Sequence, residues 1–176
     1  MSEKVFHEHI LGLIDLIADT LDWLKDEKIE SSLSGISLRF FKSFMKNDEN
    51  SLHDNISTFI SKSYAYWPSI KKRDEEFLSN NAGILFEGVD ETYINELNRL
   101  FLLKDENGDF LIPTSPTRES IWKYIECLVK DSIKYIHQYR SPDPETKKYR
   151  RTYFGKTEDF EGISVRENAT IWNVKL

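Results

Sequence analysis

The stretch PTSPTRESIWKYIECLVKDSIKYIHQYRSPDP, residues 113–144, decides the fold. Ser115 suits the N-cap of a helix, and Pro116 suits its first position, where the N–H that proline lacks would have no helical partner in any case. Pro142 and Pro144 end the helix. The apolar residues recur three and four positions apart, as on one side of an α-helix: Ile121, Trp122, Ile125, Leu128, Val129, Ile133 and Ile136.

This apolar side is too wide for a narrow coiled-coil seam. Charged residues lie opposite it, among them Lys123, Glu126, Lys130 and Lys134. We therefore expect the segment to be the central helix of the chain's own core. The alternative that the pattern leaves open is a helix whose apolar side lies in the groove of a partner protein.

The sequence before this helix shows the same periodicity. It predicts helices over residues 4–28, 33–46 and 52–65, then a short charged helix over 69–79. The sequence YAYWP should interrupt the third of these, because the residue before Pro68 is disfavoured in the helical conformation. Short polar connections separate the helices, as is typical of helical bundles.

A second change of pattern follows residue 80. Asp90 is a good N-cap for a helix over 91–102. The dipeptide Asn107-Gly108 lies between two short apolar runs and predicts a small β-hairpin or a tight loop. The predicted fold class is therefore mainly α: a helical bundle-like domain with a small β-hairpin and a partly extended C-terminal arm.

The C-terminal segment differs from the rest of the chain. We expect a helical domain over residues 1–141 and a basic, aromatic arm over 142–176. The arm contains KKYRRTYFGK, residues 147–156, and ends in TIWNVKL, whose alternation predicts a terminal strand. The residues predicted to bind a partner are Lys147, Lys148, Arg150, Arg151, Tyr153, Phe154, Trp172, Val174 and Leu176.

Composition narrows the classes of function. The net charge of −6 disfavours a general nucleic-acid coat protein, which should be basic overall. The single cysteine, Cys127, excludes an intrachain disulfide framework and a cysteine-based zinc site. No apolar run approaches the roughly 20 residues that span a bilayer, so we expect no membrane span. We also expect no signal peptide, because acidic residues interrupt the apolar N-terminal segment.

Motifs that carry chemistry are missing from the sequence. The four histidines show no metal-binding spacing, and no phosphate-binding glycine loop or serine nucleophile elbow is present. The run DENGD, starting at Asp105, fails as a calcium loop, because Phe110 and Pro116 occupy the positions of the required glycine and glutamate. We predict no catalytic, cofactor-binding or metal-binding residue, and no cofactor.

The sequence TRESIWKYIECL, residues 117–128, resembles a Thr-Lys/Arg-Glu-x-Ile-Trp-Lys-Tyr-Leu segment of uncharacterised proteins of nucleocytoplasmic large DNA viruses. LFEGVDETYINELNRLF, residues 85–101, is similar to a phrase that precedes that segment in those proteins. The likeness covers about residues 84–140 and departs from the pattern at Ile125-Glu126. It implies a viral protein of the host cytoplasm or the virion, and it carries no catalytic residue over to this chain.

Two hypotheses of function lead. In the first, the chain is a non-enzymatic structural or interaction protein that contacts a protein partner, or a second copy of itself, through its arm. In the second, it is an accessory protein that binds nucleic acid through residues 147–156, where cations and aromatic rings alternate. An enzyme with a dispersed site is the third. Under the first, truncation at Pro142 should leave a folded domain that no longer assembles.

Overall fold

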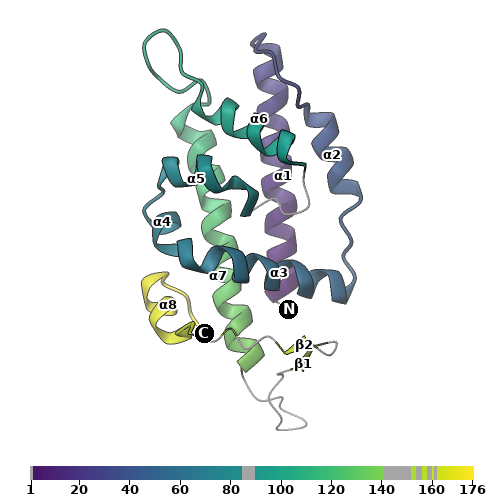
Figure 1. Ribbon diagram of the computed structural model, residues 1–176, viewed down its shortest axis with the longest axis vertical. Helices are drawn as coiled ribbons and strands as arrows, with labels where there is room; N and C mark the ends of the chain where they lie inside the picture. Colours follow the sequence, from purple (N-terminus) through teal and green to yellow (C-terminus); the bar gives the residue numbers. More distant parts are fainter. Residues whose placement is uncertain (1, 85–89, 141–151, 154–155, 158–159, 161) are drawn as a thin grey trace.

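The computed structural model describes residues 2–84, 90–140, 152–153, 156–157, 160 and 162–176, and within these ranges the chain is mainly helical. Two long helices lie side by side at the centre and run in opposite directions (Figure 1). These are α1 (Ser2–Asp26) and α7 (Glu119–Arg140). The shorter helices pack around this pair: α2 (Gly35–Ser43), α3 (Glu49–Ser63), α4 (Trp67–Lys71), α5 (Glu75–Asn81), α6 (Glu91–Leu102) and α8 (Val165–Ile171).

Helix α7 is the centre of the core, which confirms its predicted role. All seven residues of its apolar stripe are buried, and they meet the apolar side of α1. The two helices pack tightly at Gly12, where an added Cβ would lie 2.7 Å from the ring of Tyr124. Burial of these two long stripes supplies the main driving force for the fold, at roughly 25 cal/mol per Å² of apolar surface.

The start of α7 differs from the prediction. The helix begins at Glu119, and Ser115 has extended backbone angles inside an irregular turn, η3 (Thr114–Arg118). No side-chain N-cap bond forms at this end. Instead, Arg118 is buried directly before the helix and fixes its start through its own hydrogen bonds, described below.

The predicted helices over 4–28 and 91–102 are confirmed as α1 and α6. Asp90 caps α6 as expected, since its carboxylate accepts a hydrogen bond from the backbone N–H of Thr92 at 2.8 Å. The interruption before Pro68 is only partly as expected. A 3-10 turn, η1 (Tyr64–Tyr66), separates α3 from α4, but Trp67 itself is helical, with φ −54° and ψ −35°. Its buried indole donates to Ser63 Oγ at 3.0 Å, and this packing outweighs the local preference.

The turn at Asn107-Gly108 is a tight loop rather than a two-stranded hairpin. One isolated antiparallel bridge joins Lys104 to Phe110, and no longer ladder extends from it within residues 103–112. The carboxylate of Asp105 accepts hydrogen bonds from the backbone N–H groups of Asn107 and Asp109, at 2.8 and 3.0 Å. These bonds close the loop locally, as in an Asx turn, and leave those donors unavailable for a ladder. A separate short pair, β1 (Thr152–Tyr153) and β2 (Lys156–Thr157), is antiparallel.

The predicted terminal strand at residues 170–176 is wrong. Helix α8 ends at Ile171, and its N-cap Ser164 accepts from the backbone N–H of Glu167 at 3.3 Å. Because the chain is helical up to Ile171, the side chain of Trp172 can turn into the core, where only 2% of its surface is exposed. The Lys71 ammonium lies over its ring, 4.9 Å from the centroid. Residues 163–174 are thus packed on the helical domain, and residues 142–151, which would form the start of the predicted arm, lie outside the described ranges.

Candidate interaction surface

Helix α2 is apolar on two opposite sides. Its inner side packs on α1 through Leu38 and through Gly35, whose missing side chain lets the backbones approach. On its outer side, Ile36, Phe40 and Phe44 follow one another at single-turn intervals and are 74%, 66% and 66% exposed. We call these three residues the α2 ridge. Scattered single apolar residues are normal on protein surfaces, whereas a continuous ridge of large ones is a candidate binding surface.

A groove of about 430 Å³ lies between α2 and α6, alongside the α2 ridge. Its lining includes Ile14 and Leu33, Phe41 from α2, Phe44 at the C-cap of α2, and Tyr93 from α6. Tyr93 and Phe41 are themselves exposed. Together the α2 ridge and the groove form an apolar surface with a raised part and a recessed part. This shape favours a contact in which side chains of the two proteins interdigitate.

Ion pairs fix α2 on α1. The guanidinium of Arg39 donates to Asp22 at 2.7 Å and to Asp19 at 2.5 Å, and the ammonium of Lys42 donates to Asp15 at 2.5 Å. These hydrogen bonds raise the pKa of Arg39, with Asp22 contributing most. The pairs are exposed and add little stability one by one, but together with Gly35 they set the position of the helix.

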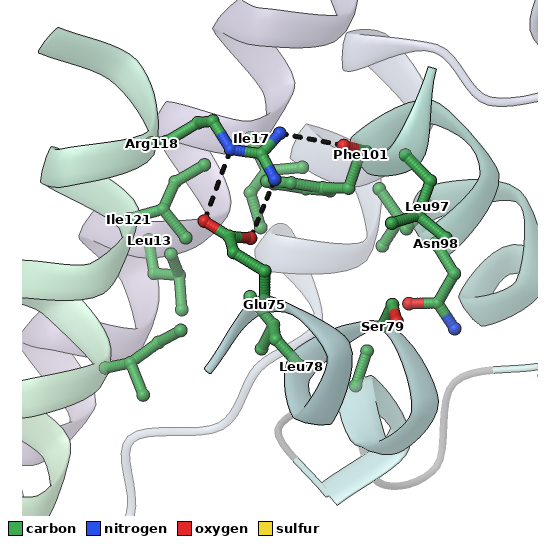
Figure 2. A pocket seen from close by; sticks show the side chains of 13 residues that line it. Leu13, Ile17, Glu75, Leu78, Ser79, Leu97, Asn98, Phe101, Arg118 and Ile121 are labelled. Carbon is green, nitrogen blue, oxygen red and sulfur yellow. Dashed lines mark hydrogen bonds and ion pairs between the residues drawn. The ribbon is translucent and has the colours of Figure 1, made fainter. Parts of the chain in front are cut away.

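A second, partly open cavity lies among α1, α5, α6 and α7 (Figure 2). Its free volume of about 30 Å³ is on the scale of a water molecule, and its lining is predominantly aliphatic. At its edge the Arg118 guanidinium lies between Glu75 and Phe101, as Figure 2 shows. It donates to Glu75 Oε2 and to the Phe101 carbonyl, both at 2.7 Å, and stacks 4.0 Å from the Phe110 ring centroid.

Glu75 is bound a second time by the indole N–H of Trp122, at 3.1 Å. Because only 3% of the Arg118 side chain is exposed, this charge depends on the carboxylate that faces it. The Arg118–Glu75 pair therefore serves to join α5, α6 and α7. The N–H groups of Arg118 that donate to Glu75 and to the Phe101 carbonyl are occupied by these bonds and are not directed at a ligand.

Other titratable groups lie in or beside the core. His9 contacts the buried carboxylate of Asp131 at 2.5 Å, and burial raises the pKa of Asp131. Burial also raises the pKa of the Cys127 thiol one turn away, which makes it a poor nucleophile. Beside an open hollow at the end of α1, the hydrogen bond from Arg99 lowers the pKa of Glu96 to about 2.

Within the described ranges, no group of three or more His, Cys, Asp or Glu residues is arranged to hold a metal ion. In the same ranges, no helix has the length and apolar character needed to cross a bilayer.

No protein-family model, curated protein or solved structure matches this chain.

The residues predicted to bind a partner differ in their burial, and only four of the nine lie within the described ranges. Trp172 is buried in the chain's own core, Val174 packs partly against that core, and Leu176 is exposed. Tyr153 is paired with Lys156 through the backbone of β1 and β2. The remaining five lie outside the described residues: Lys147, Lys148, Arg150, Arg151 and Phe154.

The α2 ridge was not predicted as a site, although the sequence held a signal for it. The predicted helix over 33–46 carries Ile36, Phe40, Phe41 and Phe44. Each residue advances a helix by about 100°, so Ile36 and Phe41 point about 140° apart, too far for both to face the same neighbouring helix. One of them had to lie toward solvent or toward a partner.

Proposed function

We propose that this chain is a non-enzymatic interaction protein that binds a protein partner through the α2 ridge and the adjoining groove. The observation that supports this most is the exposure of three large apolar side chains on consecutive turns of α2. The inner side of the same helix already packs on α1, so the ridge is not needed to attach the helix to the fold. Aromatic residues are also the type that most often carries interface energy.

The setting of this interaction is part of the proposal. The resemblance of residues 84–140 to proteins of large DNA viruses supports a viral interaction protein that acts in the host cytoplasm or the virion. The net charge of −6 supports a protein partner over nucleic acid. The basic residues 147–156 remain the candidate for a nucleic-acid contact if one exists, and they are separate in sequence from α2.

The test is to identify a binding partner by cross-linking in the natural host cell and then to measure its affinity in purified form. Phe40→Ser with Phe44→Ser should weaken binding at least about tenfold, as expected when two interface anchors are removed. Matched controls are Leu102→Ser and Ile171→Ser, since both residues are about half exposed but lie outside α2. Equal binding by the Phe40/Phe44 variant and wild type would refute the proposal, as would an equal loss in the controls.

A further inference from the structure

The borders of the α2 ridge are acidic on the side of α1. The carboxylates of Asp15, Asp19 and Asp22 line this border and are 48%, 71% and 47% exposed. Arg39 and Lys42, the two cations there, already bond to these acids. Further acids, Glu8 and Asp26, extend the same α1 segment in both directions, and the exposed Lys4 and Lys25 of that segment offset them only in part of the border, away from Asp19. A partner that approaches from this side meets an excess of negative charge.

The opposite border, at the start of α6, is acidic as well. Asp90 lines the groove, and Glu91 follows it at the exposed first turn. Hydrogen bonding to Thr92 lowers the pKa of Asp90, so its carboxylate is ionised at neutral pH. At the far end of α2, the exposed Lys46 is followed by Asp48 and Glu49 and so does not reverse the sign. The apolar surface is thus bordered by carboxylates on both long sides.

We propose that the occupant of this surface is an amphipathic helix of the partner, with apolar residues along one side and Lys or Arg residues along both edges of it. This inference rests on the proposed function and names the chemistry of its partner. A helix suits the site because the ridge spans about 12 Å, two turns of α2, and its neighbouring groove lies between two helices. The basic edges would meet Asp15, Asp19 and Asp22 on one side and Asp90 and Glu91 on the other.

The same borders disfavour two other occupants. A second copy that docked ridge to ridge about a two-fold axis would bring acidic borders near acidic borders, which costs binding energy. An anionic lipid surface would be repelled by the same carboxylates. A helix with basic edges is the occupant for which the apolar and the electrostatic features agree.

The experiment uses a displayed library of random 16-residue peptides, selected on the full chain and counter-selected on the Phe40→Ser/Phe44→Ser variant. Enriched peptides should carry apolar residues at helical spacing with an excess of Lys and Arg between them. A synthetic consensus peptide is then compared, by fluorescence anisotropy, with a version in which each Lys and Arg is Glu. The basic peptide should bind at least about tenfold more tightly, with an affinity that falls as salt rises.

Asp90→Asn with Glu91→Gln provides the matched charge variant, which should bind the basic peptide several-fold more weakly and the Glu peptide more tightly, because two repelling carboxylates are removed. Suppose that the enriched peptides bind wild type but not the Phe40/Phe44 variant, and that their edges are neutral or acidic. This result would overturn the inference about basic edges and leave the proposed binding surface intact. If light scattering shows a dimer for wild type and a monomer for the Phe40/Phe44 variant, the inference is also overturned, because the occupant of the surface is then a second copy of this chain. Peptides that bind this variant and wild type equally would overturn the proposed function itself.

Discussion

The rings of Phe40 and Phe44 pack edge to face, with their centroids 4.8 Å apart and an angle of 80° between their planes. Both side chains are nevertheless mostly exposed, so they contact each other more than they contact the core. An aromatic pair of this geometry restricts the rotamers of both rings. Less side-chain freedom is then lost on binding, which favours affinity.

Removing these rings should leave the fold intact. We expect Phe40→Ala with Phe44→Ala to change the free energy of unfolding by less than about 1 kcal/mol, because exposed positions contribute little to stability. Phe59→Ala, at a buried phenylalanine of α3, should cost about 3–5 kcal/mol. Urea unfolding of the three proteins checks this. A large loss of stability in the double variant would mean that the ridge serves the fold.

Glu75 should matter more than an exposed carboxylate. Glu75→Gln leaves the buried Arg118 charge without its counter-ion. Because the Glu75 side chain is itself 37% exposed, water replaces part of the interaction, and we expect a loss of about 1–3 kcal/mol in the free energy of unfolding. The matched control is Arg99→Gln, which breaks the more exposed pair with Glu96 and should cost at most about 1 kcal/mol. Similar losses in the two variants would show that Arg118 is solvated in solution.

Sequence patterns were sufficient to predict the central helix, because the stripe from Ile121 to Ile136 has one spacing and one buried side. The cap at Asp90 was equally readable, since capping is a local interaction. The end of the chain was misread because Trp172 and Val174 alternate as in a strand, while a tertiary contact with the core decides their conformation. The α2 ridge was missed for a related reason: periodicity identifies an apolar helix but not which of its sides the fold covers.

Removal of the buried Trp172 side chain should destabilise the fold measurably. We expect Trp172→Ala to lower the free energy of unfolding by about 3–5 kcal/mol, and a chain ending at residue 141 to lose at least as much. Leu176→Ala, at an exposed residue, should change it by less than about 0.5 kcal/mol. If Trp172→Ala kept its stability but lost a binding partner, the original assignment of Trp172 to a partner contact would be restored.

His7 should make stability depend on pH. Its ring is buried on α1, Nδ1 has no hydrogen-bond partner among the described residues, and burial lowers the pKa of His7 below its usual 6.5. The unfolded chain therefore takes up a proton at this residue before the folded chain does, and stability falls as the pH drops below about 6.5.

His7→Leu should remove this loss. The urea midpoint of the variant, relative to wild type, should rise between pH 7.5 and pH 5. Phe6→Leu is the control, because it alters the neighbouring buried residue without a titrating group, so its difference from wild type should stay constant. A constant difference for His7→Leu as well would show that His7 titrates alike in both states.

Gly35 should be intolerant of a side chain. An added Cβ would lie 2.6 Å from the Ala18 carbonyl oxygen, which is backbone and cannot turn away. We expect Gly35→Ala to lower stability by about 1–3 kcal/mol, in the range of overpacked sites, and to weaken partner binding by displacing α2. Gly83→Ala is the matched control and should be close to neutral, because an added Cβ there would have no described residue within 4 Å apart from its chain neighbours. A neutral Gly35→Ala would mean that α2 moves freely on α1.

The pairing of α1 with α7 has a consequence for synthesis on the ribosome. Helix α1 emerges first, yet the helix that covers its apolar side begins only at Glu119. Until that segment has left the exit tunnel, α2 and α3 cover the apolar side of α1 only in part, and the part that α7 will cover is open to chaperones or to other nascent chains. Although the structure is mostly helical, its folding thus depends on a contact between distant parts of the chain. Synonymous codons that slow translation before residue 119 should lengthen the time for which the apolar side of α1 stays exposed.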